Sequence, residues 1–557
     1  MSASDKKKLR KEATMAALTE KQKKEQAEAK KLKAATISFV AIMIVIALVA
    51  TSVLTVRGIN NSGIIDKKTI AAVSGSHELN SVMVNYYFTD HIQNLYQQWQ
   101  NDYGDSFSVY ISMMGLDLNA PLNEQKSSVD STMTWAEYFL DGALNKARTD
   151  LALYDKAMAE GFKLSEDEQA ALDSNEQMLQ IYALYSGYSN INQYLRAIYG
   201  YGSDLESYNE YSRISTIASA YYTAYSDSLT YNDAAIREYE KDKFDNYSSF
   251  SFSIYSVNVS DYLTGGTKDD KGNVSYSDEE IAAAEKKAEE VANTLKETGS
   301  LDALDAAISA LEVNAEAENT VTSTKYDLVK YTDMTEDYQK WLANADRKNG
   351  DITVIKNEST STDADGKEVK SLVGYDVICF MERSDNLRPL ANVRHILVQF
   401  EGGTTDSKGN KTYTEAEKAK AKEEAEKLLQ QWKDGDATEE SFIAMVKDNT
   451  DDSGSKETGG LYEDIHPESS YVESFLAWSI DSARKPGDTG VIVSDYGYHV
   501  MYYSSDDALT YRDYMITEDM RTADVDKWYE AIIKDATITA GETKRLNLDM
   551  SISSIVS

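Results

Sequence analysis

The hydrophobic and polar positions divide the chain into stretches with different periodicities. Residues 34–56 carry no charged side chain, residues 77–247 space their apolar positions as helices do, and residues 248–508 combine short alternating segments with amphipathic helices. At ~1.5 Å per residue, residues 34–56 are long enough to cross a ~30 Å hydrocarbon layer as one helix. The pattern therefore predicts a multidomain chain with an N-terminal transmembrane helix, a mostly α-helical module and α+β domains.

The charges beside the apolar stretch predict its orientation. The first 34 residues hold eleven Lys and Arg against five Asp and Glu, whereas the whole chain has a net charge of −36. The positive-inside rule places the basic segment 1–33 in the cytoplasm and the main body outside the membrane. A cleaved signal peptide, with Ala50-Thr51-Ser52 as its small-residue site, is the alternative, but the charged leader and the apolar run are both longer than such signals usually have.

Charge and cysteine content exclude several classes of protein. An acidic body repels phosphate groups, so we expect no nucleic acid partner. The only cysteine, Cys379, lies on an alternating apolar strand and is expected in a core, which leaves no disulfide framework. No cysteine follows the apolar segment to accept a lipid, so retention at the membrane would depend on the helix itself.

A Gly-, Asn- and Ser-containing linker over residues 57–76 is expected to lead into the helical module at 77–247. Within this module, Ser165-Glu-Asp-Glu168 has the pattern of a capping box, which marks a helix start. The module is rich in tyrosine, whose apolar ring and polar tip suit either ordinary helix packing or contact with exposed polypeptide. Both interpretations stay open for Tyr182, Tyr185, Tyr188, Tyr194, Tyr199, Tyr201, Tyr208, Tyr211, Tyr221, Tyr222 and Tyr225.

Residues 248–386 and 387–508 repeat one pattern. Trp341 matches Trp478 and Gly350-Asp351 matches Gly487-Asp488 at a constant offset, and capping boxes begin at Ser277 and Thr414 with the same offset. Each copy opens and closes with a strand-like segment around its helices. The period is far longer than the ~20–50 residues of stacked repeats, so we interpret the copies as two tandem α+β domains. A C-terminal helical tail over 509–557, which can pack on the helical module, completes the predicted organisation.

Two histidines distinguish the second copy from the first. His395 lies in its opening strand and His499 in its closing strand, within Gly-Tyr-His-Val. The first copy has Gly-Tyr-Asp-Val with Asp376 at the closing position, and its opening strand, near Ser253, has no histidine. The asymmetry indicates a site that is present in the second copy and absent from the first.

The second copy resembles the parvulin family of peptidyl-prolyl cis/trans isomerases, and the long extracytoplasmic foldases of the PrsA and SurA type in particular. Five blocks carry the resemblance in family order over about 115 residues. The blocks are Val393-Arg-His-Ile-Leu-Val398, Asn449-Thr-Asp-Asp-Ser453, Gly459-Gly-Leu461, Phe475 before Lys485-Pro-Gly-Asp488, and Asp495-Tyr-Gly-Tyr-His499. The resemblance implies a parvulin domain over 387–508, a degenerate parvulin-like domain over 248–386, and a chaperone-like role for the helical module.

Carried over by position, the resemblance implies catalytic roles for His395, Asp452 and His499. It implies a proline pocket formed by Leu461, Tyr471 and Phe475, with Ser494 as a polar neighbour. Two departures bear on substrate range: the usual Gly-Gly-Asp-Leu-Gly block is shortened here, and the pocket position that often holds methionine falls on Tyr471, or on Val472 if the register slips. No cofactor is expected, because rotation about a peptide bond needs no nucleophile.

Other interpretations of the same residues remain. The histidines and Asp452 could bind a metal, although the local spacing of a zinc motif is missing, or His395 could be a structural residue. The leading functional hypothesis is a membrane-anchored isomerase that acts on proline-containing, newly secreted or unfolded polypeptides. The alternative is a holdase that binds such chains through the helical module and uses the parvulin fold for docking. A surface adhesin has no positive feature in its favour, and the oligomeric state is left open.

Overall fold

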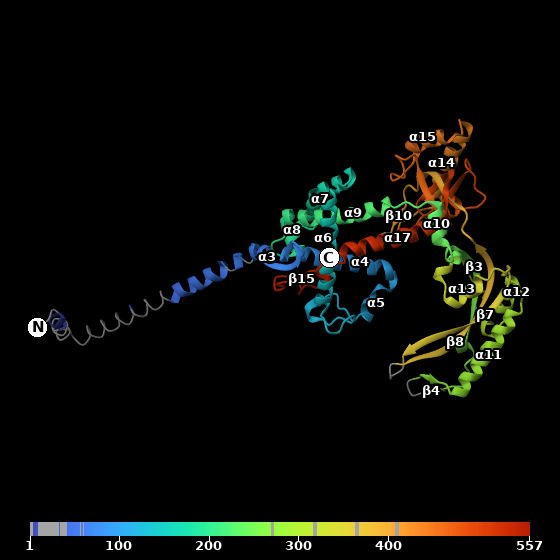
Figure 1. Ribbon diagram of the computed structural model, residues 1–557, viewed down its shortest axis with the longest axis horizontal. Helices are drawn as coiled ribbons and strands as arrows, with labels where there is room; N and C mark the ends of the chain where they lie inside the picture. The colour runs from blue at the N-terminus through green and yellow to red at the C-terminus, as the bar shows by residue number, and fades with distance from the viewer. Residues whose placement is uncertain are drawn as a thin grey trace. The chain divides into compact units, whose positions relative to one another are not determined.

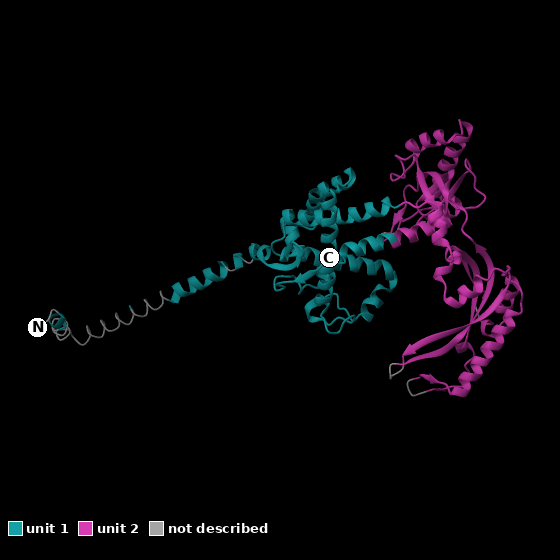
Figure 2. Cartoon of the chain, viewed as in Figure 1, with its two compact units in different colours: residues 1–229, 524–557 teal, residues 230–523 magenta. Residues whose placement is uncertain are grey.

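The computed structural model describes residues 4–8, 33, 42–55, 57–59, 61–268, 272–315, 320–362, 367–406 and 411–556. These residues form two compact units (Figure 2). The first comprises residues 1–229 and 524–557, and the second comprises residues 230–523. Both ends of the chain thus belong to the first unit, and both copies of the repeat belong to the second.

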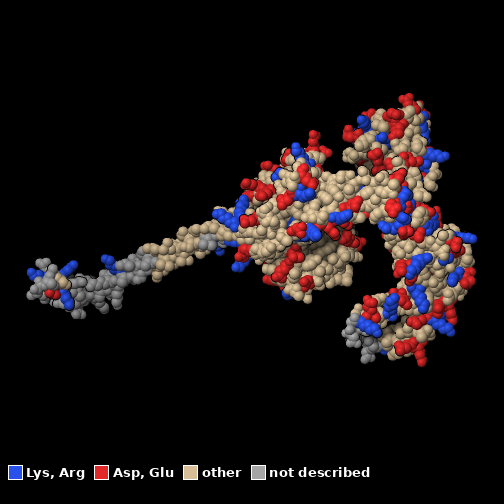
Figure 3. Space-filling view, viewed as in Figure 1, with Lys and Arg blue, Asp and Glu red and all other residues tan. Residues whose placement is uncertain are grey.

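One helix in the described part of the chain is long and apolar enough to cross a membrane. It covers Ile42–Ile59, has a mean hydropathy of 2.3, and its described residues are all exposed. Its described residues from 42 to 55 form a stretch without charged atoms in Figure 3. The predicted span of 34–56 overlaps this helix, while residues 34–41 and 56 lie outside the described residues. A signal sequence near an N-terminus can also form an apolar helix of this kind, so length and composition alone do not separate an anchor from a signal.

The first unit is mostly helical, as the spacing of its apolar residues predicts. Its helices of nine or more residues begin at side-chain caps, and the predicted capping box at Ser165 and Glu168 is confirmed. Helices α4, α6 and α9 pack against one another and enclose Tyr86, Trp135 and Phe139, which are fully buried. The helices are α3 (Ile64–Lys68), α4 (Ser81–Tyr103), α5 (Phe107–Met113), α6 (Trp135–Glu160), α7 (Glu166–Tyr185), α8 (Ile191–Tyr199), α9 (Leu205–Ser228) and α18 (Ile552–Val556).

A small sheet joins the two ends of the first unit. Strand β1 (Ile70–Ser74) pairs with β2 (His77–Asn80) on one side and with β15 (Ile538–Ala540) on the other. Residues Ile552 and Ile555 of the C-terminal segment are buried in the same core as α4 and α6. The linker predicted over 57–76 is therefore shorter than expected, because α3 and β1 lie within it and Ala71 and Ala72 are buried by sheet pairing. The C-terminal tail, predicted to be helical, also contributes a strand.

The tyrosines of the first unit divide between core and surface. Tyr199 and Tyr211 are buried, and each donates a hydrogen bond to Asp90, at 2.9 and 2.8 Å. Burial raises the pKa of Asp90, and the two tyrosine hydroxyls oppose that rise. Tyr182 and Tyr185, in contrast, are 49% and 91% exposed near the end of α7. Ordinary helix packing thus accounts for some of the tyrosines and not for others.

The second unit contains two four-stranded antiparallel sheets with the same strand order. The first sheet runs β6-β3-β8-β7 and the second β12-β9-β14-β13, each with its opening and closing strands paired at the centre. Figure 1 shows β3, β7 and β8 of the first sheet. The strands are β3 (Ser249–Asn258), β6 (Thr324–Lys330), β7 (Ile352–Thr362), β8 (Glu368–Ser384), β9 (Pro389–Gln399), β12 (Leu461–Ile465), β13 (Thr489–Val493) and β14 (Gly497–Thr510), with the short hairpins β4 (Thr267–Lys268) and β5 (Val274–Ser275), and β10 (Thr404–Thr405) and β11 (Lys411–Thr412). The helices are α10 (Asp233–Glu240), α11 (Asp278–Lys296), α12 (Leu301–Ser309), α13 (Glu336–Leu342), α14 (Glu415–Asp434), α15 (Glu439–Asn449), α16 (Glu473–Ser479) and α17 (Tyr511–Ile533), which continues into the first unit.

Each sheet is covered on one face by two helices that include the longest of its copy, and on the other face by one short helix. In the second sheet, Ile396, Val500 and Tyr502 pack with residues of α14 and α15, whereas Val393 and Met501 pack with residues of α16. Successive strand residues point to opposite faces, so this alternation assigns the positions of β9, and those of β14 up to the register shift after Tyr503, to one face or the other. The first sheet is built the same way, with α11 and α12 on one face and α13 on the other. The capping boxes predicted at Ser277 and Thr414 are confirmed, and the expectation that Cys379 is a core residue holds.

Candidate functional site

The pairing of β9 with β14 brings the two strand histidines to one face of the second sheet. His395 lies opposite Met501 and His499 lies opposite Leu397, so the histidines occupy diagonal positions on adjacent strands. Residues in this relation lie within reach of each other's side chains. Both share the face of Met501, which is covered by the single short helix α16 and not by α14 and α15. His395 is 4% and His499 5% exposed.

The two imidazoles form the middle of a continuous hydrogen-bond chain. His395 Nδ1 lies 2.9 Å from His499 Nδ1, and the rings stack with centroids 5.1 Å apart. His395 Nε2 lies 2.9 Å from Asp452 Oδ2, and His499 Nε2 lies 2.7 Å from Ser494 Oγ. All three catalytic residues implied by the resemblance, together with Ser494, are thus connected in space.

The carboxylate sets the direction of this chain. An ionised carboxylate only accepts hydrogen bonds, so His395 donates through Nε2–H to Asp452. When His395 Nδ1 carries no hydrogen, it accepts from His499 Nδ1–H, and His499 Nε2 then accepts from the Ser494 hydroxyl. Ser494 Oγ already accepts the backbone N–H of Tyr496 at 3.2 Å, which leaves its own hydrogen free to donate.

Asp452 is held by the segment that follows α15. The backbone N–H of Asp451 donates to the Leu397 carbonyl at 2.9 Å, and Thr450 Oγ1 accepts the N–H groups of Leu397 and Asp452. These bonds dock the segment against β9 beside His395. The Asp452 carboxylate is therefore positioned by the backbone of the sheet.

Four donors converge on the Asp452 carboxylate. Oδ2 accepts His395 Nε2–H, the Ser455 hydroxyl and the Tyr462 hydroxyl, the last at 2.9 Å, and Oδ1 accepts the Gly454 N–H at 3.0 Å. The hydrogen bond from His395, with those from Ser455, Tyr462 and Gly454, holds the pKa of Asp452 far below its ordinary value although burial acts in the other direction. Burial and the neighbouring carboxylate raise the pKa of Tyr462 to about 12. The carboxylate is ionised and the phenol is protonated at neutral pH.

His499 is neutral at physiological pH. Burial, followed by the proximity of His395, lowers the pKa of His499 to about 4, while Asp452 acts weakly in the opposite direction. A neutral ring can accept a hydrogen bond at one nitrogen and donate at the other, which the chain from Ser494 to Asp452 requires.

An aromatic pocket of about 390 Å³ opens beside the two histidines. Phe475 of α16 meets the His395 ring edge to face at 5.4 Å, and Tyr462, Tyr471 and Phe475 contact one another with centroids 5.3–5.5 Å apart. The pocket is lined by His395, Leu397, Gln399, Asp451, Asp452, Ser453, Tyr462, Ser470, Tyr471, Val472, Phe475, Tyr496 and His499. Tyr471 and Val472 both line it, so the structure includes both alternatives for the position that often holds methionine.

Leu461, expected in the pocket, does not line it, and this assignment is corrected. Its strand neighbour Tyr462 lines the pocket in its place, because consecutive residues of β12 point to opposite faces. The sequence interpretation also missed Ser455, which bonds the Asp452 carboxylate. The aromatic side chain directly after Gly459-Gly460-Leu461 was the available signal for Tyr462. Ser455 had no comparable signal.

The equivalent place in the first sheet holds different chemistry. Asp376 pairs with Ser256 as His499 pairs with Leu397, and Ile254 stands where the second sheet has His395. The Asp376 carboxylate accepts the Ser256 and Tyr338 hydroxyls, each at 2.6 Å, and is 4% exposed. Tyr338 lies on α13, three residues before Trp341, as Phe475 lies three residues before Trp478 on α16. A closed hydrogen-bonded group thus occupies the position of the aromatic pocket.

The described residues contain no group of three or more His, Cys, Asp or Glu side chains arranged to hold a metal ion. Both ring nitrogens of His395 are already within hydrogen-bond distance of His499 or Asp452. The site is therefore an apolar pocket, one side of which is formed by side chains in a hydrogen-bond chain of defined direction.

Comparisons with known proteins identify part of the chain. The sequence profile of the PPIC-type PPIase domain matches residues 377–505. No curated protein matches the chain. Among solved structures, PrsA from Bacillus subtilis shares 14% identity, covers 77% of this chain and 97% of its own, and has a TM-score of 0.23.

Other similar structures match a smaller part. PrsA from Bacillus anthracis shares 17% identity over 27% of this chain and 59% of its own, with a TM-score of 0.17. A SurA-like chaperone of Campylobacter jejuni shares 18% identity over 27% of this chain and 53% of its own, with a TM-score of 0.15. The chain thus spans little more than half the length of these two proteins. Its second sheet and the site described above belong to a parvulin domain of the PPIC type.

Proposed function

We propose that this protein is a peptidyl-prolyl cis/trans isomerase that assists the folding of proline-containing polypeptides outside the membrane. The observation that carries the proposal is the aromatic pocket bounded by Phe475 and Tyr471, with the hydrogen-bonded His499, His395 and Asp452 at its wall. A proline ring fits an apolar, aromatic slot, and its tertiary amide has no N–H that the slot would have to satisfy. Spontaneous isomerisation takes ~10–100 s, which makes it a slow step in folding.

The proposed chemistry needs no bond to be made or broken. The barrier of ~18–20 kcal/mol arises from conjugation across the amide, and it falls as the amide twists and that conjugation is lost. The aromatic rings would hold the proline ring and exclude water, so that polar groups at the wall act on the twisting amide in a medium of low dielectric constant. A thousandfold acceleration needs only ~4 kcal/mol of preferential binding to the twisted form.

Each polar residue has a defined part in this proposal. Asp452, ionised and held by four donors, fixes the tautomer of His395 and the orientation of the Tyr462 hydroxyl. His395 and Ser494 in turn fix the tautomer of His499. The network keeps the wall of the pocket rigid, so its dipoles need no rearrangement when the amide twists.

The first sheet is proposed to be a parvulin-like domain without isomerase activity. Its strand order supports this relation, and the Ser256–Asp376–Tyr338 group supports the loss of the pocket. The helix at Ile42–Ile59 supports anchoring to the membrane, with the basic N-terminus in the cytoplasm and the main body outside.

A holdase is the second candidate function, and the end of α7 favours it. Met178, Ile181, Tyr182 and Tyr185 recur at helical spacing and are between 49% and 91% exposed, beside Leu184 at 61%. Such an exposed apolar stripe suits the transient binding of unfolded chains. The first unit would bind clients, and the parvulin domain would act on prolines or serve only for docking.

The experiment that separates the two functions measures cis/trans exchange of a short proline peptide by NMR, with and without the full chain in detergent. An increase in the exchange rate that disappears with Phe475→Ala supports the isomerase. No increase over the uncatalysed rate, from a protein that still suppresses client aggregation, would contradict the isomerase and favour the holdase.

A further inference from the structure

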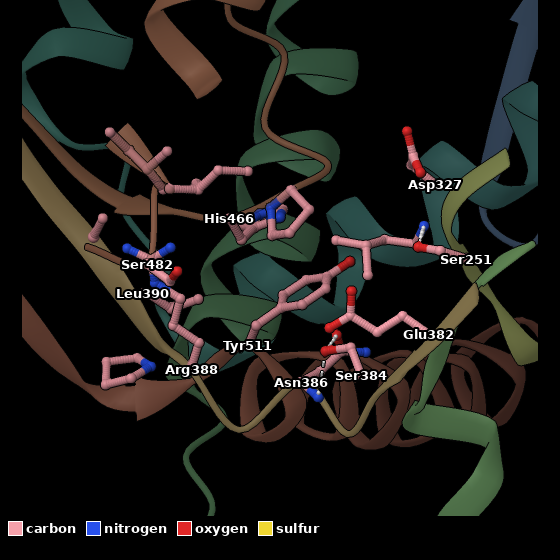
Figure 4. Close-up of a pocket in the computed structure, with 16 residues that line it drawn as sticks. Ser251, Asp327, Glu382, Ser384, Asn386, Arg388, Leu390, His466, Ser482 and Tyr511 are labelled. Carbon is pink, nitrogen blue, oxygen red and sulfur yellow. Dashed lines mark hydrogen bonds between the residues drawn. The ribbon is translucent and has the colours of Figure 1, made fainter. Parts of the chain in front are cut away.

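A second cavity of about 480 Å³ lies in the second unit, away from the aromatic pocket. One side is formed by the first sheet, and the other by β9, the loop after β12 and the start of α17 (Figure 4). It is lined by Ser251, Asp327, Leu328, Glu382, Ser384, Asn386, Arg388, Pro389, Leu390, Ala391, Ile465, His466, Pro467, Ile480, Ser482 and Tyr511. None of the residues proposed for isomerisation lies in it.

Two carboxylates without a cationic partner mark the first-sheet side. Asp327 and Glu382 are exposed, and neither forms an ion pair with any residue that the structure describes. Figure 4 shows both carboxylates on the same side of the cavity as Ser251. Glu382 pairs with Ser251 across β8 and β3, and β6 is the next strand, so Asp327 lies two strand spacings, or ~10 Å, from Glu382.

A bulge in β6 opens this edge. The pairing of β3 with β6 shifts between Phe250 and Phe252, and Leu328 adopts a φ of 50°, which is unfavourable for a branched side chain. The Leu328 N–H donates to the side chain of Ser251 at 3.0 Å in place of a ladder hydrogen bond. Leu328 is 40% exposed as a result, and it adds an apolar surface beside the carboxylates.

Aromatic rings form the opposite wall. His466 stacks on Tyr511 with centroids 5.3 Å apart and 11° between the ring planes, and its ring lies 4.5 Å from that of Tyr514. Its Nδ1 accepts the Glu468 N–H at 3.3 Å, and burial lowers the pKa of His466. The ring is therefore neutral with its hydrogen on Nε2, and that donor has no hydrogen-bond partner in the described part of the chain. The Glu468 carboxylate, in contrast, is already paired with Lys330 at 2.5 Å.

We propose that this cavity binds an extended polypeptide segment with two basic residues, with Asp327 and Glu382 each contacting one cationic side chain and His466 donating to the peptide backbone. The inference rests on the proposed function insofar as its ligand is an unfolded client. Charge-assisted hydrogen bonds to carboxylates and contacts of a cation with aromatic faces are the interactions that favour Lys and Arg. In an extended segment, alternate side chains point the same way ~7 Å apart, so a Lys-Xaa-Lys sequence can approach both carboxylates.

The test uses short, labelled, proline-free peptides, which leave the isomerase pocket unoccupied. One contains Lys-Xaa-Lys and the other Glu-Xaa-Glu in the same position. Their binding to the full chain in detergent is measured by fluorescence anisotropy at low ionic strength. We compare the parent with Asp327→Asn/Glu382→Gln and with a control of equal charge change, Glu289→Gln/Glu297→Gln, which alters exposed residues at or after α11 outside the cavity.

The parent and the control should bind the Lys peptide, and the cavity variant should bind it about tenfold or more weakly, since charge-assisted hydrogen bonds are lost. His466→Phe, which keeps an aromatic ring but removes the donor, should also weaken binding. Equal affinity for both peptides, or equal affinity of the cavity and control variants, would overturn the proposal.

A third variant separates this proposal from the proposed function. Asp452→Ala should lose isomerase activity and retain binding of the Lys peptide, because Asp452 is not part of the cavity. If the parent has no isomerase activity but still binds the peptide through Asp327 and Glu382, the proposed isomerase function is contradicted and the proposed cavity site is not. Loss of peptide binding in well-folded Asp452→Ala would place the peptide at the isomerase pocket and overturn the cavity as its site.

Discussion

His499 and Asp376 occupy the same position in two sheets of the same strand order. Each is the third residue of a Gly-Tyr-Xaa-Val segment, and each faces the opening strand of its sheet, opposite Leu397 and Ser256 respectively. His499 takes part in a hydrogen-bond chain beside an open pocket, whereas Asp376 is closed off by Ser256 and Tyr338. Because the two sheets have equivalent positions, a substitution in the second sheet can be compared with a control substitution at the matching position of the first.

Tyr462→Phe should lower the isomerase rate about tenfold, since it removes one donor from the ionised Asp452 and leaves the ring in place. Tyr326→Phe is the control, because Tyr326 has the corresponding place opposite Phe252 in the first sheet. The rate of exchange of a proline peptide measures both variants. A similar loss in both would mean that the effect is not specific to the Asp452 network.

Asp452→Ala combined with Phe475→Ala should abolish most isomerase activity and leave suppression of client aggregation nearly unchanged. The substitutions remove the carboxylate and the proline slot, while the exposed end of α7 lies in the other unit. No residual activity is expected from the first sheet, because Asp376 and Tyr338 close its corresponding position. Residual activity equal to that of the parent would show that the site is assigned wrongly.

Folding must be checked in the same experiment. Phe475 is 3% exposed, and its truncation costs ~3–5 kcal/mol if the cavity left behind stays open. Circular dichroism of the double variant should match the parent before its activity is interpreted. If aggregation suppression disappears along with the activity in a folded variant, the parvulin domain itself is the main client-binding surface.

The second sheet should lose stability as the pH falls from about 6.5 to about 4. The pKa of His499 is lowered to about 4 in the folded protein, so over this range the unfolded chain binds a proton that the folded chain excludes. The stabilisation that comes from the lowered pKa of His499 is fully present above the ordinary histidine pKa. At the lower end of this pH range, the free energy of unfolding has fallen by on the order of 3 kcal/mol. Asp452, whose pKa is lowered, adds a further loss only at more acidic pH.

Hydrogen exchange of the β9 and β14 amides, corrected for intrinsic exchange rates, measures this effect at pH 7 and near pH 4.5. His499→Gln should be less stable than the parent at pH 7 and should lose less stability on acidification. An equal pH dependence in parent and variant would contradict the assignment of a buried neutral His499.

Arg512→Met should destabilise the second unit by ~3–5 kcal/mol, because it removes the buried cation that pairs with one carboxylate oxygen of Glu240 and leaves Arg237 as its remaining partner. Arg512 is fully buried, donates to the carbonyl oxygens of Tyr247, Asp385 and Phe244, and lies 3.8 Å over the Phe244 ring. Arg512→Met with Glu240→Met should cost less than the single change, which denaturant unfolding can measure. If the double variant lost as much stability as the two single variants together, a strong coupling between Arg512 and Glu240 would be excluded.

Protease added to intact cells stripped of their wall should remove the main body and leave a short membrane-bound fragment. The basic residues before the Ile42–Ile59 helix favour a cytoplasmic N-terminus. Protection of the whole chain would contradict this orientation. Release of the intact body without added protease would instead indicate a cleaved signal.

The sequence by itself determined the features that depend on short-range patterns. Helix starts at Ser165, Ser277 and Thr414 follow from capping side chains three residues from their partners, and the apolar helix follows from the absence of charge. The duplication was visible because strand and helix signals recur at nearly constant spacing. His395, His499, Phe475 and Tyr471 could be found because family blocks keep their order along the chain.

Only the tertiary structure decided which of these residues meet and how. His395 is 57 residues from Asp452 and 104 from His499, so their hydrogen bonds depend on strand register and on the docking of residues 450–452 against β9. A shift of one residue exchanges the faces of a strand, which is why the adjacent Leu461 and Tyr462 have different environments. The Ser256–Asp376–Tyr338 group and the cavity beside Asp327 likewise arise from packing between segments that are distant in the sequence. Local periodicity predicts which face of a helix or strand is buried, but not which element packs against that face.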